Sequence, residues 1–171
     1  MLDFSREEKS KELAFTPKEL FIKYSDMVWR LALTRVQSKA YADDVLQEVF
    51  LRVVKAKPQF KDEQHAKAWL IKVTLNCANK LLSSAWVRHF ASFDEGQMPD
   101  TYAEIEDNSL LLAVSKLKPK YRMVIHLYYY EDLKVGEISA MLNISLSAVK
   151  QRLKRAREEL KDYMTGDEDI V

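Results

Sequence analysis

Residues 143–160 read NISLSAVKQRLKRAREEL and hold a turn, a helix start and a dense basic run. Four apolar residues of this stretch share one narrow stripe of a helix, which turns by about 100° per residue. They are Val149, Leu153, Ala156 and Leu160. Polar and charged side chains occupy the rest of the circumference. The pattern predicts a helix that packs on one side and presents hydrogen-bonding groups on the other.

The residues just upstream complete a larger unit. Residues 137–142 predict a short helix, Asn143 tolerates the left-handed backbone that a tight turn often needs, and Ser145 is a good N-cap. A short helix, a tight turn and a second helix with a basic outer face form the helix-turn-helix pattern. The alternative is a helical hairpin with a solvated charged face, because basic runs are more often solubilising. Cap, turn and stripe agree with each other and favour DNA binding.

The second helix of this unit normally enters the major groove of DNA. There Lys and Arg can read guanine, Gln can read adenine, and peripheral basic side chains hold phosphates. We expect Arg152 and Arg157, which border the apolar stripe, to hold phosphates. The full set expected to contact DNA is Ser147, Lys150, Gln151, Arg152, Lys154, Arg155 and Arg157.

The composition indicates a mostly helical, soluble protein. Glycine and proline are scarce, with 3 and 4 residues, and the single cysteine, Cys77, cannot form an internal disulfide. The N-terminus lacks the apolar core of a secretion signal, and no apolar stretch has membrane-spanning length. We therefore expect a cytoplasmic protein without membrane insertion. We find no motif for a catalytic site, a metal site or a cofactor.

The net charge of +1 hides a strong asymmetry along the chain. Residues 17–88 carry a balance of +6 and residues 116–165 a balance of +5. Between them, residues 89–115 contain six acids and no Lys or Arg. Two basic lobes separated by an acidic connector are more compatible with nucleic acid than the total charge suggests.

Helical signals run through both basic lobes. Thr16, Pro17 and Glu19 form a capping box at a helix start. Apolar periodicity then predicts helices over about residues 40–56, 63–86, 109–117 and 121–130, in addition to those described above. The expected fold is all-α, with two small helical domains.

The helix predicted over residues 40–56 carries a polar face. Composition alone does not decide the role of this face. Asp44 and Glu48 are like charges four residues apart, which destabilises an isolated helix slightly, so an Arg-rich partner would explain them. A solvated acidic face is the simpler explanation, and from the residues alone we favour it.

Two longer segments resemble known regions of bacterial sigma factors. The segment LKPKYRMVIHLYYYEDLKVGEISAMLNISLSAVKQRLKRAREEL resembles their fourth region, and YADDVLQEVFLRVVKAKPQFKDEQHAKAWLIKVTLNCANKLL resembles their second region. Only these two regions have counterparts, which is the layout of the extracytoplasmic-function (ECF) group. The resemblance implies an N-terminal extension (1–16), region 2 (17–89), an acidic linker (90–107), region 4 (108–165) and an acidic tail (166–171).

The resemblance also implies partners and further site residues. Region 4 would bind the duplex −35 promoter element, and region 2 would bind core RNA polymerase and the single-stranded −10 element. An anti-sigma factor is a common partner of such proteins. The implied polymerase contacts are Asp43, Asp44, Gln47, Glu48 and Arg52. The implied −10 contacts are Phe60, Lys61, Lys67, Asn76, Asn79 and Lys80, whereas we expect Trp69 to lie in the core.

Two other functions fit parts of the sequence. A two-domain regulator with a LuxR-like helix-turn-helix would bind duplex sites without core polymerase. A helical scaffold or an enzyme of another kind would leave the basic helix unexplained.

Overall fold

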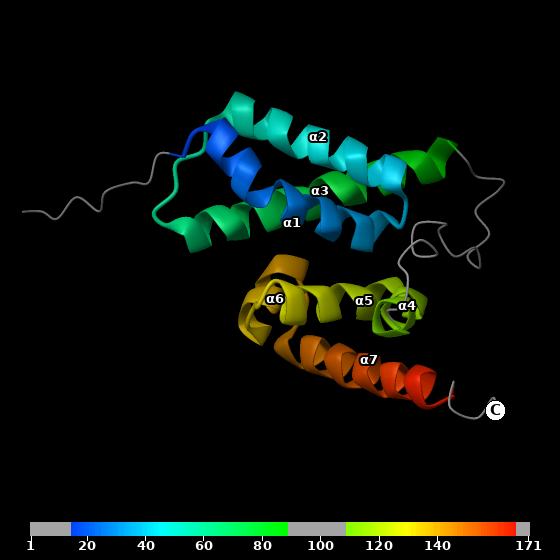
Figure 1. Cartoon of the computed structure of the whole chain (residues 1–171). Coiled ribbons are helices and arrows are strands. Elements are labelled where there is room, and N and C mark those ends of the chain that lie inside the picture. Colours follow the sequence, from blue (N-terminus) through cyan, green and yellow to red (C-terminus); the bar gives the residue numbers. More distant parts are fainter. Residues whose placement is uncertain (1–14, 89–108, 167–171) are drawn as a thin grey trace, which may run out of the picture.

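The structure, a computed structural model, describes residues 15–88 and 109–166. Its regular structure in these two ranges is helical, which confirms the all-α prediction (Figure 1). The elements are α1 (Pro17–Val36), α2 (Lys39–Ala56), α3 (Glu63–Arg88), α4 (Ser109–Lys116), α5 (Pro119–Ile125), the π-helix η2 (His126–Tyr130), α6 (Val135–Leu142) and α7 (Leu146–Gly166). We call α1–α3 the first lobe and α4–α7 the second lobe. The predicted N-terminal extension, acidic linker and tail fall almost wholly outside the described residues.

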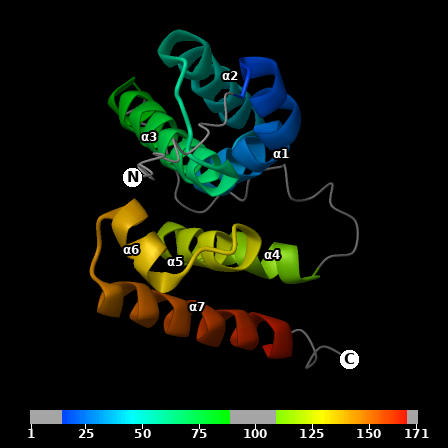
Figure 2. The same ribbon diagram turned by 90° about the vertical axis from the view of Figure 1, so that its left-hand side faces the viewer.

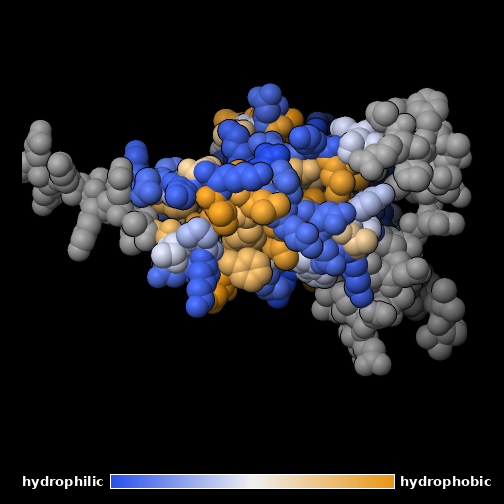
Figure 3. Space-filling view, turned by 90° about the horizontal axis from the view of Figure 1, so that it is seen from above, coloured by the Kyte–Doolittle hydropathy of each residue, from blue (hydrophilic) through white to orange (hydrophobic). Residues whose placement is uncertain are grey.

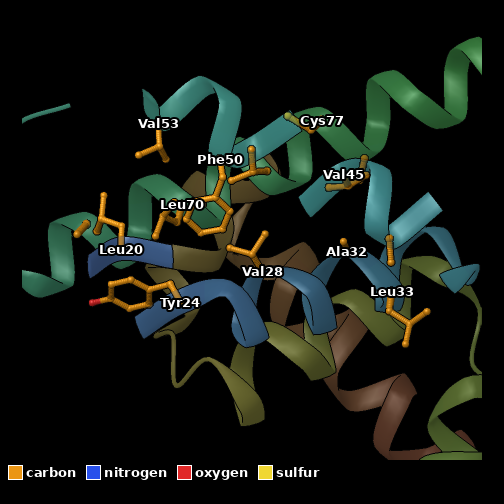
Figure 4. Packing of buried hydrophobic residues seen from close by; sticks show 14 of the residues in the cluster. Leu20, Tyr24, Val28, Ala32, Leu33, Val45, Phe50, Val53, Leu70 and Cys77 are labelled. Atoms are coloured by element: carbon orange, nitrogen blue, oxygen red, sulfur yellow. The ribbon is translucent and has the colours of Figure 1, made fainter. Parts of the chain in front are cut away.

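The first lobe is a three-helix unit built around one apolar core. Its first helix starts at the predicted capping box, where Glu19 N–H donates to Thr16 Oγ1 (3.2 Å) and Thr16 N–H donates to the Glu19 carboxylate (2.8 Å). Figure 4 shows side chains from all three helices meeting between them, among them Val28, Val45 and Leu70. These three are at most 1% exposed. The core therefore fixes which faces of α1, α2 and α3 remain outside.

The second lobe buries the predicted stripe of α7. Val149, Leu153 and Ala156 are at most 2% exposed, and the half-buried Leu160 packs against the same core. The stripe prediction is confirmed.

The helix predicted over residues 121–130 is interrupted, which corrects that prediction. It begins earlier, at Pro119, and becomes a π-helix at His126. The wider turn is closed by the Glu131 N–H, which donates to the His126 carbonyl (3.2 Å). It also brings the Glu131 carboxylate within 3.0 Å of His126 Nε2. The contact between His126 and Glu131 thus accompanies the change from α-helix to π-helix. The spacing of apolar residues in the sequence does not predict this contact.

The two lobes pack directly against each other. Figures 1 and 2 both place α1 and α3 toward α5 and α6, with α2 and α7 on opposite outer sides of the molecule. Leu31, Ile71 and Leu75 belong to the first lobe but are buried in the apolar cluster of the second. The lobes therefore share a continuous apolar contact.

A chain of polar side chains also crosses between the lobes, and we call Thr34, His126, Glu131 and Lys67 the interlobe chain. Thr34 Oγ1 lies 2.9 Å from His126 Nδ1, and His126 Nε2 lies 3.0 Å from the Glu131 carboxylate. Lys67 Nζ donates to the Glu131 carbonyl (2.8 Å) and lies 3.3 Å from its carboxylate. Burial alone would raise the pKa of Glu131, but His126 and Lys67 lower it below its ordinary value.

A buried arginine adds a second polar connection. Arg122, 2% exposed, donates through Nε to the carbonyl of Thr34 in the first lobe (2.9 Å). Its Nη1 donates to the carbonyls of Leu117 (2.8 Å) and Ser115 (3.1 Å) at the end of α4. This guanidinium thus ties α5 to the end of α1 and to the end of α4.

No helix in residues 15–88 and 109–166 is long and apolar enough to cross a membrane. The same residues bring together no group of three or more His, Cys, Asp and Glu side chains that could hold a metal ion.

The turn between α6 and α7 has the predicted left-handed residue and N-cap. Asn143 has φ 53°, and Ser145 Oγ accepts from the Ala148 N–H (3.1 Å). Ser139 adds a bond that sequence reasoning did not foresee, because its hydroxyl donates to the Ile144 carbonyl (2.6 Å). The turn is therefore held from both of its ends.

Replacing Asn143 with Val should destabilise the protein, because a β-branched residue is strained in the left-handed region that Asn tolerates. We expect a loss of about 1–2 kcal/mol in the free energy of unfolding. Asn143→Gly is the matched control and should stay within about 0.5 kcal/mol of wild type. Urea unfolding followed by circular dichroism measures both; equal stability of the two variants would contradict the strain argument.

Candidate nucleic-acid interface and partner-binding face

The outer face of α7 presents the predicted DNA-contacting residues to solvent. Gln151, Lys154 and Arg155 are exposed, Arg152 is half-buried, and α7 lies on the outer side of the second lobe in both ribbon views. Lys154 and Glu158 form an exposed pair at 4.0 Å, too weak to withhold the lysine from a phosphate. In the part of the chain that the structure describes, these side chains are therefore available to a ligand.

A basic cleft lies where the start of α5 meets the first half of α7. It has a volume of about 260 Å³ and is lined by Lys120, Tyr121, Ala148, Gln151, Arg152 and Arg155. A hydrogen bond with Arg155 lowers the pKa of Tyr121. The Lys120 ammonium lies 5.0 Å from the centre of the Tyr121 ring. Two arginines and a lysine therefore converge beside Gln151.

Sequence reasoning missed Lys120 and Tyr121, because it followed only the second helix of the unit. The available signal was their place directly after Pro119, where a new helix begins. Because α5 starts beside α7, the side chains in the first turn of α5 lie on the same surface as the basic side chains of α7.

Arg157 lies on the opposite flank of α7 from Arg152. Its Nε donates to the Tyr129 hydroxyl (2.8 Å), and its guanidinium lies 5.5 Å and 5.6 Å from the ring centres of Tyr128 and Tyr129. There it borders an apolar groove of about 660 Å³ between α4, η2 and α7. The two residues that we predicted to hold phosphates are thus on different sides of the helix.

The polar face of α2 is exposed, as predicted, and its charges are partly paired. Arg52 Nε donates to the Glu48 carboxylate (2.9 Å), which lowers the pKa of Glu48. Trp29 Nε1 donates to Asp43 (2.8 Å). Because Arg52 offsets the charge of Glu48, the predicted repulsion between Glu48 and Asp44 is weakened.

Apolar side chains interrupt this charged face. Leu51 (52% exposed) and Val54 (53%) lie on the outer side of α2, and Phe21 (47%) and Ile22 (71%) lie on α1. Figure 3, seen from above, shows hydrophobic residues gathered among hydrophilic ones on this side of the molecule. Exposed apolar side chains that gather among charged ones are typical of a protein-binding site.

Sequence reasoning named only the polar residues of this face. The signal for the others was present, because Leu51 and Val54 fall at outward positions among Gln47 and Glu48 on α2. We call these four apolar residues, together with the predicted polymerase contacts, the α2 face.

The residues predicted to contact the −10 element do not form one group. Lys61 is exposed near the start of α3, whereas Lys67 is held by Glu131 in the interlobe chain. Asn79 accepts from Arg35 Nε (2.9 Å). Lys80 lines a groove of about 270 Å³ with Asp44, Glu48 and Arg52. Along α3 it lies about 20 Å from Lys67.

Phe60 does not suit the −10 role that we predicted, and we remove it from that set. It is 1% exposed and belongs to the core of the first lobe. Its ring makes edge contacts with Trp69 (5.8 Å between centres) and His65 (5.5 Å). A ring enclosed in this way offers no free face to a base. Trp69 is half-buried and packs on the same core, as expected.

Two family models together match most of the chain. The model described as Sigma-70 region 2 matches residues 20–88, and the model described as Sigma-70, region 4 matches residues 107–160. The first covers the first lobe, and the second covers the second lobe nearly to the end of α7.

Two relatives that match along most of the chain are ECF sigma factors. The ECF RNA polymerase sigma factor SigL of Mycobacterium tuberculosis is 30% identical over 152 residues, which cover 84% of this chain and 86% of the relative. The ECF RNA polymerase sigma factor SigM of Bacillus subtilis is 29% identical over 153 residues, covering 85% and 93%. These matches favour the sigma-factor prediction over the LuxR-like alternative.

Solved structures share the fold. The sigma factor RpoE from Bartonella quintana, in complex with the anti-sigma factor NepR, has a TM-score of 0.68 at 15% identity and covers 86% of this chain and 96% of its own. CnrH, in complex with the cytosolic domain of CnrY, has a TM-score of 0.61 at 23% identity, covering 88% of each chain.

Phe60→Ala should act on stability, because it removes a fully buried ring. We expect the free energy of unfolding to fall by about 3–5 kcal/mol. The exposed neighbour is the control, and Lys61→Ala should change the value by less than about 0.5 kcal/mol. Urea unfolding measures both. A small effect at Phe60 would return that ring to the candidates for base contact.

Proposed function

The chain belongs to the sigma-70 family of RNA polymerase sigma factors, in its ECF group, and from this membership we propose how its surfaces recognise a promoter. It is an alternative sigma factor that directs promoter-specific transcription, and sigma factors are initiation factors rather than enzymes. Its partners are core RNA polymerase and promoter DNA, and it acts in the cytoplasm. The first lobe serves as region 2 and the second as region 4.

The second lobe binds the duplex −35 element through α7. The observation that supports this most strongly is the buried stripe of Val149, Leu153 and Ala156, because it turns the basic residues outward. Gln151 and Lys154 face the base edges, and Lys120, Arg152 and Arg155 hold phosphates along the basic cleft. Arg157 contacts the backbone on the opposite flank, with its guanidinium positioned by Tyr129.

The first lobe binds core polymerase through the α2 face. Exposed Leu51 and Val54 supply the apolar centre, and Asp44, Gln47 and Glu48 supply the polar rim. Interfaces between proteins combine these features, whereas a solvated acidic face needs no apolar residues. Asp43 and Arg52 orient the rim through Trp29 and Glu48.

The first two-thirds of α3, with the residues just before it, bind the single-stranded −10 element. Lys61 and Lys67 follow the backbone of the strand, and Asn76 and Asn79 supply amides for extruded bases. Lys80 lies nearer the α2 face, at the boundary between the proposed −10 site and the proposed polymerase-binding site.

An anti-sigma factor is the remaining proposed partner. The structures of RpoE and CnrH, which share this fold, were determined with bound proteins, and the partner of RpoE is named as an anti-sigma factor. A protein of that class would keep this chain from core polymerase until it is released.

Gln151→Ala and Arg152→Ala should separate base reading from phosphate holding. Gln151→Ala should reduce discrimination between the cognate promoter and variants altered at one base pair of its −35 element, by about 1–3 kcal/mol at that pair. Arg152→Ala should weaken binding to every sequence alike and reduce the slope of log K against log salt by about 1. Fluorescence anisotropy of the holoenzyme on promoter duplexes measures both. Identical behaviour of the two variants would show that the faces of α7 are misassigned.

Asp44→Ala should weaken binding to core polymerase about tenfold, which corresponds to about 1.4 kcal/mol. Asp26→Ala is the control, because Asp26 is an equally charged, exposed residue of the first lobe outside the α2 face. Interferometry with immobilised core enzyme gives both dissociation constants, and run-off transcription tests the proposed function itself. Equal affinities of the two variants would show that Asp44 belongs to a solvated face and does not contribute to polymerase binding.

A further inference from the structure

A half-buried arginine at the end of α1 contacts one of the proposed −10 residues. Arg35 lies in the last turn of α1, and its Nε donates to the side-chain oxygen of Asn79 on α3 (2.9 Å). Asn79 is exposed, whereas Arg35 is only partly so. Sequence reasoning named Asn79 and not Arg35, because the two residues are 44 positions apart in the chain. The contact therefore connects α1 to a site so far assigned to α3 and the residues just before it.

The chemistry of the arginine decides which way the Asn79 amide is turned. A guanidinium carries only N–H donors, so the amide can meet it only with its oxygen. The torsion that rotates an Asn amide is otherwise soft, and an exposed amide without such a partner adopts several orientations. With its oxygen held by Arg35, the amide turns its nitrogen away from that side chain. Asn79 then offers two N–H donors at the surface.

An amide that is held in this way favours one kind of partner. Extruded bases are read through hydrogen bonds to their edges, where carbonyl oxygens and unprotonated ring nitrogens accept and amino groups donate. The amide nitrogen of Asn79 matches an accepting atom of a base, whereas a freely turning amide would also match an amino group. Holding the amide before the strand arrives also avoids the entropy that a mobile side chain loses on binding. A positioned Asn79 would therefore gain both selectivity and affinity.

From this geometry we propose that Arg35 is a positioning residue of the −10 site. It holds the Asn79 amide with its nitrogen outward, so that Asn79 donates to an accepting atom of an extruded base. The inference rests on the proposed function, because Asn79 reads a base only if the first lobe binds the −10 strand. Asn76, about one turn earlier on α3, lies outside the contact between Arg35 and Asn79 and serves as an internal reference.

Arg35→Met tests the positioning role, because it removes the donor and keeps an unbranched side chain. The measurement is the anisotropy of fluorescent single strands bound to the holoenzyme. The strands carry the −10 element of a promoter that the holoenzyme transcribes, with each base replaced in turn, and Asn79→Ala identifies the position that Asn79 reads. Arg35→Met should lose about fivefold in discrimination at that same position, which is the value of one hydrogen bond. Discrimination at the position read by Asn76 should stay unchanged.

Arg30→Met is the matched control for Arg35→Met. Arg30 is an exposed arginine of the same helix that pairs with Asp26 (2.7 Å), so its replacement makes the same change in charge. It should leave discrimination intact at every position. Arg35→Lys keeps a donor and should restore part of the lost discrimination. The double variant Arg35→Met with Asn79→Ala should be no worse than Asn79→Ala alone, because the two side chains act as a unit.

Two other roles of Arg35 give different results. If Arg35 held a phosphate of the strand, Arg35→Met would weaken binding to every strand alike and reduce the slope of log K against log salt by about 0.7. If Arg35 only tied α1 to α3, the variant would unfold at a lower urea concentration and discriminate bases as wild type does. Either result would overturn the proposal.

Nuclear magnetic resonance of the free protein gives a second test that needs no DNA. The side-chain N–H groups of Asn79 should have a high order parameter in wild type and a lower one in Arg35→Met, because the bond to Arg35 restrains the amide. Equal order parameters in the two proteins would overturn the positioning role.

The outcomes also separate the positioning role from the proposed function. Discrimination that is lost in Asn79→Ala and kept in Arg35→Met would overturn the positioning role and leave the −10 site intact. Discrimination that Asn79→Ala keeps at every position would instead remove Asn79 from the proposed −10 site, and the positioning role with it. Absence of run-off transcription from every promoter would count against the sigma-factor function as a whole. In that case the order parameters of the free protein still decide whether Arg35 holds the amide.

Discussion

Burial of one apolar stripe on α7 determines which side chains of this helix face outward. Val149, Leu153 and Ala156 are almost fully enclosed, and burying a Val or Leu side chain contributes about 1.5–3 kcal/mol. Rotating α7 by one residue, about 100°, would expose these groups and drive charged side chains into the core at far greater cost. The stripe therefore sets which residues meet DNA, and no DNA contact is needed to hold the helix in that orientation.

The elements that the sequence predicted well depend on neighbours in the chain. The capping box at Thr16, the left-handed Asn143 and the stripe of α7 are local patterns, and the structure contains all three. Predicted helix starts agree to within about two residues, which is the ordinary uncertainty of such ends, whereas the helix predicted over residues 121–130 changes type at His126. Local patterns also place the polar face of α2 outside.

What the sequence did not predict depends on residues far apart in the chain. The π-helix at His126 accompanies a contact with Glu131, and Lys67 is bound by a residue of the other lobe. The resemblance to sigma factors implied a DNA contact for Phe60, yet the core of the first lobe encloses it. Lys120 joins the basic cleft only because α5 begins against α7. Residue spacing encodes none of these tertiary contacts. The sequence therefore predicted most residues of the candidate site but only part of their arrangement in space.

The π-helix shows how this part of the chain can take up an extra residue. A π turn holds one residue more than the α turn that it replaces, so losing one residue between His126 and Glu131 would restore the ordinary helical repeat. The glutamate would then follow His126 by four residues, a spacing that in an α-helix also places two side chains on one face. In evolutionary terms, the length of this turn can change by one codon without separating the imidazole from the carboxylate.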